Sequence, residues 1–123
     1  MTRNVSDKRK YPRVPIDNLI TYALIDEEGN EVGQGLGKAL NVSQNGILIM
    51  TNQQITSKYI FLISIDINNK LIENIGKIIF SKENEHGTFN TGISFRGDHL
   101  DNVQFRRNLI RLYHHRHVLK MKN

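Results

Sequence analysis

The chain has 123 residues, a length suited to one domain with a single sizeable core. It carries 17 Lys and Arg against 12 Asp and Glu, so its formal net charge is +5. This excess of positive charge favours an anionic partner such as a nucleotide, nucleic acid or a membrane surface. The sequence contains no cysteine, which excludes disulfides, thiolate metal sites and cysteine nucleophiles.

The first stretch, residues 1–15, is charged and polar, and Pro12 and Pro15 are expected to block regular structure there. No apolar segment of signal-peptide length follows its positive charges, and nowhere do about 18 apolar residues run together. The sequence therefore predicts a flexible N-terminal arm over residues 1–15 and a folded domain over residues 16–123. It also predicts a cytoplasmic location and no membrane insertion.

Strand-like patterns fill the middle of the chain, separated by turn-forming residues. The predicted strands are residues 19–25, 31–40, 46–50, 59–67, 71–82 and 88–95. In the fourth of these, Phe61, Ile63 and Ile65 alternate with Leu62 and Ser64, which is the period of a half-buried strand. Glycines at alternate positions 33, 35 and 37 indicate a bend or bulge. Six antiparallel strands at this spacing are typical of a small barrel, so the predicted class is mainly β.

The period changes near the end of the chain, where residues 98–120 are predicted to form a helix. Asp98 is the expected N-cap, and Asp101 three residues later suits the positive end of the helix dipole. One apolar stripe is expected to pack on the open end of the barrel. Its members are Phe105, Leu109, Leu112 and Tyr113.

Two short motifs carry candidate binding residues. In "RKYPR", Arg9 and Arg13 place two guanidinium forks four residues apart around a proline. In "NVSQNG", Asn41 and Ser43 share one face of an extended chain, and Gly46 stands where the backbone must bend or allow a close approach. Arginine binds phosphate and also matches the O6 and N7 acceptors of guanine, so this pair of motifs suits a ligand with both groups.

Together these motifs resemble those of the PilZ domain family, bacterial receptors for the second messenger cyclic di-GMP. "RKYPR" is similar to the family's RxxxR motif and "NVSQNG" to its [D/N]xSxxG motif, and the strands and terminal helix follow in the family's order. The resemblance implies a six-stranded antiparallel PilZ-type β-barrel with a C-terminal α-helix, belonging to a stand-alone receptor domain.

The resemblance also implies roles for individual residues. Arg9 and Arg13 would hold phosphates and guanine edges on an arm that closes over the ligand. Asn41, Ser43 and Gly46 would receive a guanine on the barrel surface. Lys8 and Lys10 are further candidates. A cation just before the first arginine, where Lys8 stands, suits the extra phosphates of an intercalated ligand pair. Ligand-induced ordering of the arm would then signal to an effector protein, with no cofactor other than the ligand cyclic di-GMP.

The sequence has no motif that indicates catalysis or metal binding. Ser43 has no activating His or Asp at a motif spacing and lies outside a glycine elbow, so the chain is not expected to be an enzyme. His114 and His117 have no third ligand at a recognisable spacing, so no metal site is predicted, and solvated histidines are the favoured interpretation.

Two alternative binding functions remain. The first is a nucleic-acid-binding small β-barrel, which is disfavoured because such barrels use surface aromatics. There is no Trp, and four phenylalanines are expected in the core. They are Phe61, Phe80, Phe89 and Phe95. The second is a PilZ-fold adaptor that binds proteins without a ligand, and the presence of both motifs speaks against it.

Overall fold

The computed structural model describes the backbone of residues 12–122 and the side chains up to residue 119. Its elements are β1 (Val14–Pro15), β2 (Leu19–Ile25), β3 (Glu31–Val42), β4 (Gly46–Thr51), β5 (Tyr59–Ile65), β6 (Leu71–Glu83), β7 (Phe89–Phe95) and α1 (His99–Lys122). The six longer strands match the predicted ones closely, because alternation and turn residues are local signals.

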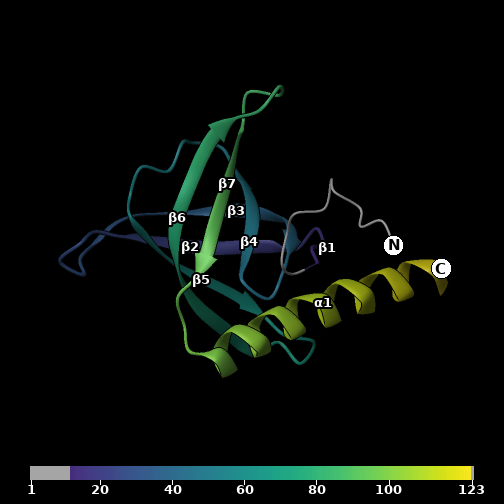
Figure 1. Ribbon diagram of the computed structural model, residues 1–123. Helices are drawn as coiled ribbons and strands as arrows, with labels where there is room; N and C mark the ends of the chain where they lie inside the picture. The colour runs from purple at the N-terminus through teal and green to yellow at the C-terminus, as the bar shows by residue number, and fades with distance from the viewer. Residues whose placement is uncertain (1–11, 123) are drawn as a thin grey trace, which may run out of the picture.

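The sheet closes into a barrel. The strands follow the order β3-β2-β5-β6-β7-β4, every neighbouring pair is antiparallel, and β4 pairs back with β3. Closure leaves the six strands without a free edge along most of their length. The predicted six-stranded antiparallel barrel is confirmed, and Figure 1 shows α1 lying across one end of it.

Strand β1 pairs with β3 past the point where β2 begins, so it lengthens the sheet along β3. Val14 pairs with Val42 and Pro15 pairs with Asn41, while the Ile16 amide donates to the carbonyl oxygen of Leu40 at 3.1 Å. The expectation that Pro15 would prevent regular structure is therefore wrong. A strand of two residues at a sheet margin tolerates proline, since the missing N–H need not serve a second neighbour.

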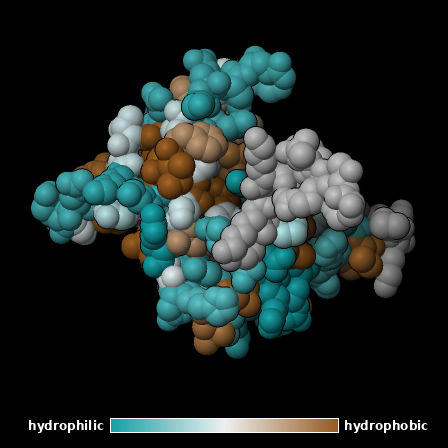
Figure 2. All heavy atoms as spheres, in the orientation of Figure 1, coloured by the Kyte–Doolittle hydropathy of each residue, from teal (hydrophilic) through white to brown (hydrophobic). Residues whose placement is uncertain are grey.

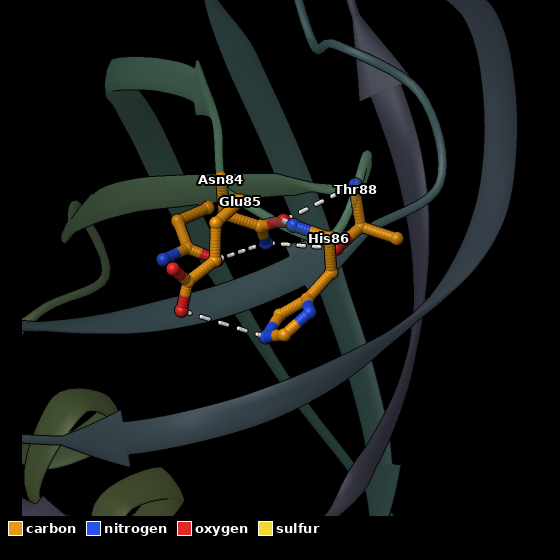
Figure 3. A network of polar contacts seen from close by, with 5 residues as sticks. Asn84, Glu85, His86 and Thr88 are labelled. Carbon is orange, nitrogen blue, oxygen red and sulfur yellow. Dashed lines mark hydrogen bonds and ion pairs between the residues drawn. The ribbon is translucent and has the colours of Figure 1, made fainter.

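Three hairpin turns share one construction. Asp26, Asp66 and Asn84 each use the side-chain Oδ1 atom to accept the backbone N–H groups two and four residues later, at 2.8 to 3.2 Å. Figure 3 shows the third of these turns. The fourth residue of each turn has a positive φ: 87° at Gly29, 64° at Asn69 and 81° at Gly87. Glycine and asparagine are the residues that adopt this conformation most readily, so the sequence determines these turns locally.

The core fills the barrel and continues under the helix. Its buried apolar side chains are Ile16, Ile20, Tyr22, Ala39, Val42, Ile47, Ile49, Ile55, Ile60, Leu62, Ile93, Phe95, Phe105 and Leu109. The ring of Phe105 meets the ring of Phe95 edge to face at 5.8 Å between centroids. Asp98 caps the helix by accepting the Asp101 amide at 2.9 Å, which confirms the predicted cap.

The buried face of β5 differs from the one that its alternation suggested. Ile60, Leu62 and Ser64 point inward, whereas Phe61 is only half-buried and Ile65 is exposed. Both faces of this strand carry large apolar residues, so alternation alone could not select the inner one.

Candidate ligand-binding site

A β-bulge in β3 brings Asn41 to the barrel surface. Gly37 and Ala39 point inward, and unbroken alternation would also turn Asn41 inward. The register with β4 shifts between Ala39 and Asn41, so that Leu40 is the extra residue and Val42 becomes the buried one. Bulges often re-aim side chains in this way beside functional sites.

The two sequence motifs meet at this bulge. Arg13 immediately precedes β1, whose pairing with β3 places Pro15 opposite Asn41. The Arg13 Nη1 atom donates a hydrogen bond to Asn41 Oδ1 at 2.9 Å. The structure therefore brings together two predicted binding residues that are 28 positions apart in the sequence.

Ser43 serves the turn between β3 and β4. Its Oγ atom accepts the amides of Asn45 and Gly46, each at 3.2 Å, and its own amide donates to the Gly46 carbonyl at 2.8 Å. The side chain is buried. The hydroxyl thus compensates backbone groups that the turn would leave unpaired, and its contact with guanine stays a prediction.

Gly46 is required by the packing of two strands. A Cβ atom at this position would overlap the carbonyl oxygen of Ile93 on β7. Asn45 adds a second contact between the turn and β7, since its carbonyl oxygen accepts a hydrogen bond from the Phe95 amide at 2.7 Å. The six residues of "NVSQNG" therefore end β3, form the turn and hold β4 against β7. This accounts for the turn's composition without a ligand, while leaving Asn41 at the surface.

A hollow of about 300 Å³ opens beside Arg13 and Asn41. It is lined by Arg13, Asn41, Ile47, Leu48, Ile79, Phe80, Gly92, Ile93 and Ser94. One rim offers a guanidinium and an amide, whereas the remainder is largely apolar. Such a combination suits a ligand that has both polar edges and flat apolar faces.

A second bulge shapes the far side of this hollow. In β6, Ile78 pairs with Ile93 and Phe80 pairs with Gly92, so Ile79 is the extra residue. Ile79 and Phe80 consequently both face outward, with exposed fractions of 58% and 39%. Figure 2 shows hydrophobic atoms gathered on this face of the barrel, over β6 and β7.

The prediction that four phenylalanines lie in the core is wrong for three of them. Phe80 is exposed because of the bulge, and Phe61 and Phe89 are half-buried, leaving Phe95 as the buried one. Since these rings are exposed or half-buried, a lack of surface aromatics no longer disfavours a nucleic-acid-binding barrel. A glycine on the neighbouring strand, Gly92, leaves space for the Phe80 ring at the surface. This signal could be recognised only once the register of β6 and β7 was known, because the register pairs Phe80 with Gly92.

Lys8, Arg9 and Lys10 lie outside the described residues. Within the described chain, the segment following β1 reaches the helix: Asp17 accepts a hydrogen bond from Arg116 Nη2 at 3.0 Å and lies 3.5 Å from His117 Nε2. His117 also packs against the ring of Tyr113, with centroids 4.1 Å apart. His117 is therefore partly buried by its contacts with Asp17 and Tyr113, whereas His114 is exposed.

Two further findings concern residues 12–122. No group of three His, Cys, Asp or Glu side chains there is arranged to hold a metal ion. None of the helical structure in this range is both long and apolar enough to cross a membrane.

The closed barrel, the helix over its end and the joined motifs define a small β-barrel domain with a candidate site for an anionic ligand. The sequence profile of the PilZ domain matches residues 7–115, so the chain belongs to the PilZ domain family. By sequence, the chain matches no curated protein.

Solved structures share the fold. The Bacillus subtilis inhibitor of motility MotI/DgrA superposes with a TM-score of 0.61 at 14% identity, over 85% of this chain and 51% of that one. The K. pneumonia MrkH–c-di-GMP complex gives 0.59 at 14% identity, over 95% and 54%. The PilZ domain of Escherichia coli YcgR with c-di-GMP gives 0.53 at 10% identity, over 93% and 98%. This chain thus spans about half the length of MotI and MrkH, and identities this low show the fold alone.

Proposed function

We propose that this protein is a receptor for cyclic di-GMP, acting in the bacterial cytoplasm. The observation that carries the proposal is the hydrogen bond from Arg13 to Asn41, which joins the two motifs at the rim of the hollow. Membership of the PilZ family and the c-di-GMP in the MrkH and YcgR structures support it.

The chemistry of the site matches that ligand. Cyclic di-GMP carries two phosphates and two guanines. A guanidinium can hold a phosphate as a bidentate fork or donate to O6 and N7 of guanine, and the Asn41 amide offers both a donor and an acceptor to a base edge. Arg9, with Lys8 and Lys10, would add positive charge from the N-terminal arm, and the net charge of +5 favours the approach of an anion.

Binding rather than catalysis is the proposed activity. The ligand would pin residues 1–15 against the barrel surface, with charged contacts exceeding the conformational entropy that the arm loses. The altered surface would then be presented to an effector protein. Asp17 offers a route to the helix, because it lies two residues after β1 and contacts Arg116.

Isothermal titration calorimetry of the full chain with cyclic di-GMP tests the proposal. Cyclic di-AMP, GTP and a short single-stranded RNA serve as controls for base, phosphate and polyanion. Saturable binding of cyclic di-GMP, with much weaker heats for the three controls, is the expected result. Binding of the RNA in preference to cyclic di-GMP would favour a nucleic-acid-binding barrel, and no binding of any nucleotide would favour an adaptor without a ligand.

A further inference from the structure

A second hollow, of about 290 Å³, opens on the outer face of strands β3, β2, β5 and β6. Its lining includes Leu19, Thr21, Leu36, Ile63, Ile65 and Leu71, none of which lines the hollow beside Arg13. We propose that a second copy of the chain binds to this face, giving a reversible two-fold dimer. The proposal does not rest on cyclic di-GMP binding, because the two hollows share no residue.

The register of the strands makes this face continuous. Leu36, Thr21 and Ile63 pair in one row across β3, β2 and β5. Side chains two residues apart in a strand share a face, so Ile65 lies on the same surface, and it pairs with Leu71 on β6. A largely apolar surface therefore crosses four strands.

The leucines of this face are open to water. Leu19, Leu36 and Leu71 have exposed fractions of 60%, 58% and 70%. Residues 1–11 contain only three apolar side chains, so the N-terminal arm is poorly suited to cover them. Contiguous apolar patches of more than a few hundred Å² are rare on monomeric proteins and usually mark an interaction site.

The size of the face suits a weak dimer. Strands about 4.8 Å apart, with a rise of about 3.3 Å per residue, give four strands of five residues an area of roughly 300 Å². Side-chain relief and a polar rim enlarge this area, yet it stays below the roughly 800 Å² per partner of a standard interface. We therefore expect a dissociation constant in the micromolar range or above.

Opposite charges on its two flanks favour a second copy as the partner. Exposed Lys38 flanks the face on β3, where it pairs with Leu19, and exposed Glu73 flanks it on β6, where it pairs with Ile63. If the two-fold axis runs along the strands, β3 of each copy lies over β6 of the other. Lys38 then meets Glu73 of the other copy, and symmetry repeats the contact. The same axis sets Leu19 over Ile65, so apolar centre meets apolar centre.

Sedimentation equilibrium of the full chain tests the proposal. Wild type should approach the mass of two chains as its concentration rises through the micromolar range. Leu19→Lys should weaken dimerisation by about tenfold or more, because it buries a charge against apolar side chains. Leu100→Lys is the matched control, since Leu100 on α1 is 61% exposed and lies outside the face. Equal melting temperatures for the two variants at low concentration show that both fold.

Charge reversal tests the two-fold arrangement itself. Lys38→Glu and Glu73→Lys should each weaken the dimer by about threefold to tenfold at low salt, because each brings like charges together twice. An equimolar mixture of these two variants should dimerise as well as wild type, since both rim contacts then join opposite charges.

Three results would overturn the proposal. Wild type might sediment as one chain into the millimolar range, which would leave the face to the arm or to a different protein. A dimer that Leu19→Lys leaves intact would place the contact elsewhere, and a mixture that fails to recover would exclude this two-fold axis. Each of these results leaves the receptor function standing, because that function is measured at the other hollow.

Discussion

Arg13 donates a hydrogen bond from Nη1 to Oδ1 of Asn41 at 2.9 Å, across the pairing of β1 with β3. The bond holds at the rim a guanidinium that also lines the hollow. A guanidinium has five N–H donors, and this contact uses one of them. Binding can therefore add contacts to Arg13 without first moving it far, which limits the entropy lost on association.

The first prediction concerns this arginine. Arg13→Ala should weaken cyclic di-GMP binding roughly tenfold to a hundredfold, because hydrogen bonds to a charged group contribute about 1.5–3 kcal/mol. Arg13→Lys should recover only part of the loss, since an ammonium cannot form the planar fork. The melting temperature of the free variant should stay close to wild type, because the Arg13–Asn41 bond is exposed. Calorimetric titration checks the affinities, and Arg9→Ala should behave as Arg13→Ala does. Wild-type curves for both alanine variants would contradict the assignment.

The second prediction separates charge from base contact. Asn41→Ala should weaken binding by an amount that persists as salt is raised, because a neutral amide acts through short-range hydrogen bonds. The contribution of Arg13 should instead shrink with ionic strength, since exposed charges are screened. Titrations of wild type and both variants at low and high salt give the slopes. A common slope for all three proteins would show that this division of roles is wrong.

Strand positions and turns could be read from the sequence because both depend on neighbouring residues. The orientation of Asn41 and Phe80 could not, because each depends on a bulge that appears only when two strands pair. The sequence motif still identified Asn41 as a binding candidate. Phe80 was placed in the core, since a phenylalanine in an apolar strand is usually buried.

Ser43 shows a different limit of sequence reasoning. Asn, Ser and Gly favour both turns and ligand contacts, so composition could not separate the two roles.

The third prediction follows from the hydrogen bonds of Ser43 within the turn. Ser43→Ala should lower the free energy of unfolding by about 1–3 kcal/mol, because two backbone amides lose a buried acceptor. Urea denaturation measures the change, with Ser57→Ala as a half-buried serine control. Equal midpoints for the two variants would show that the hydroxyl is dispensable to the turn.

The fourth prediction uses the turn at Asp66. Hydrogen bonds from the amides of Lys70 and Asn68 hold the pKa of this carboxyl below its ordinary value of 3.8. The carboxylate therefore contributes stability above that value, and the contribution is lost as the pH falls through the lower pKa of the folded state. Asp66→Asn should keep the bonds, as Asn84 does in the equivalent turn, without the titration. The difference in melting temperature between wild type and Asp66→Asn should thus shift in favour of the variant between neutral pH and about pH 3. A difference independent of pH would contradict this.

The last prediction concerns the arm. We expect cyclic di-GMP to engage Arg9 and Arg13 together, so that the chain between them is held against the barrel and becomes a poor protease substrate. Trypsin should then cut more slowly after Arg9 and Lys10 when the ligand is saturating. Cleavage after Lys120 should change little, because no described residue of α1 lines the hollow formed by β3, β4, β6 and β7. Mass spectrometry of timed digests reads each site separately, and Arg13→Ala provides a variant in which protection should be reduced at equal ligand concentration. Equal cutting of the arm with and without bound ligand would show that the receptor signals by some means other than ordering this segment.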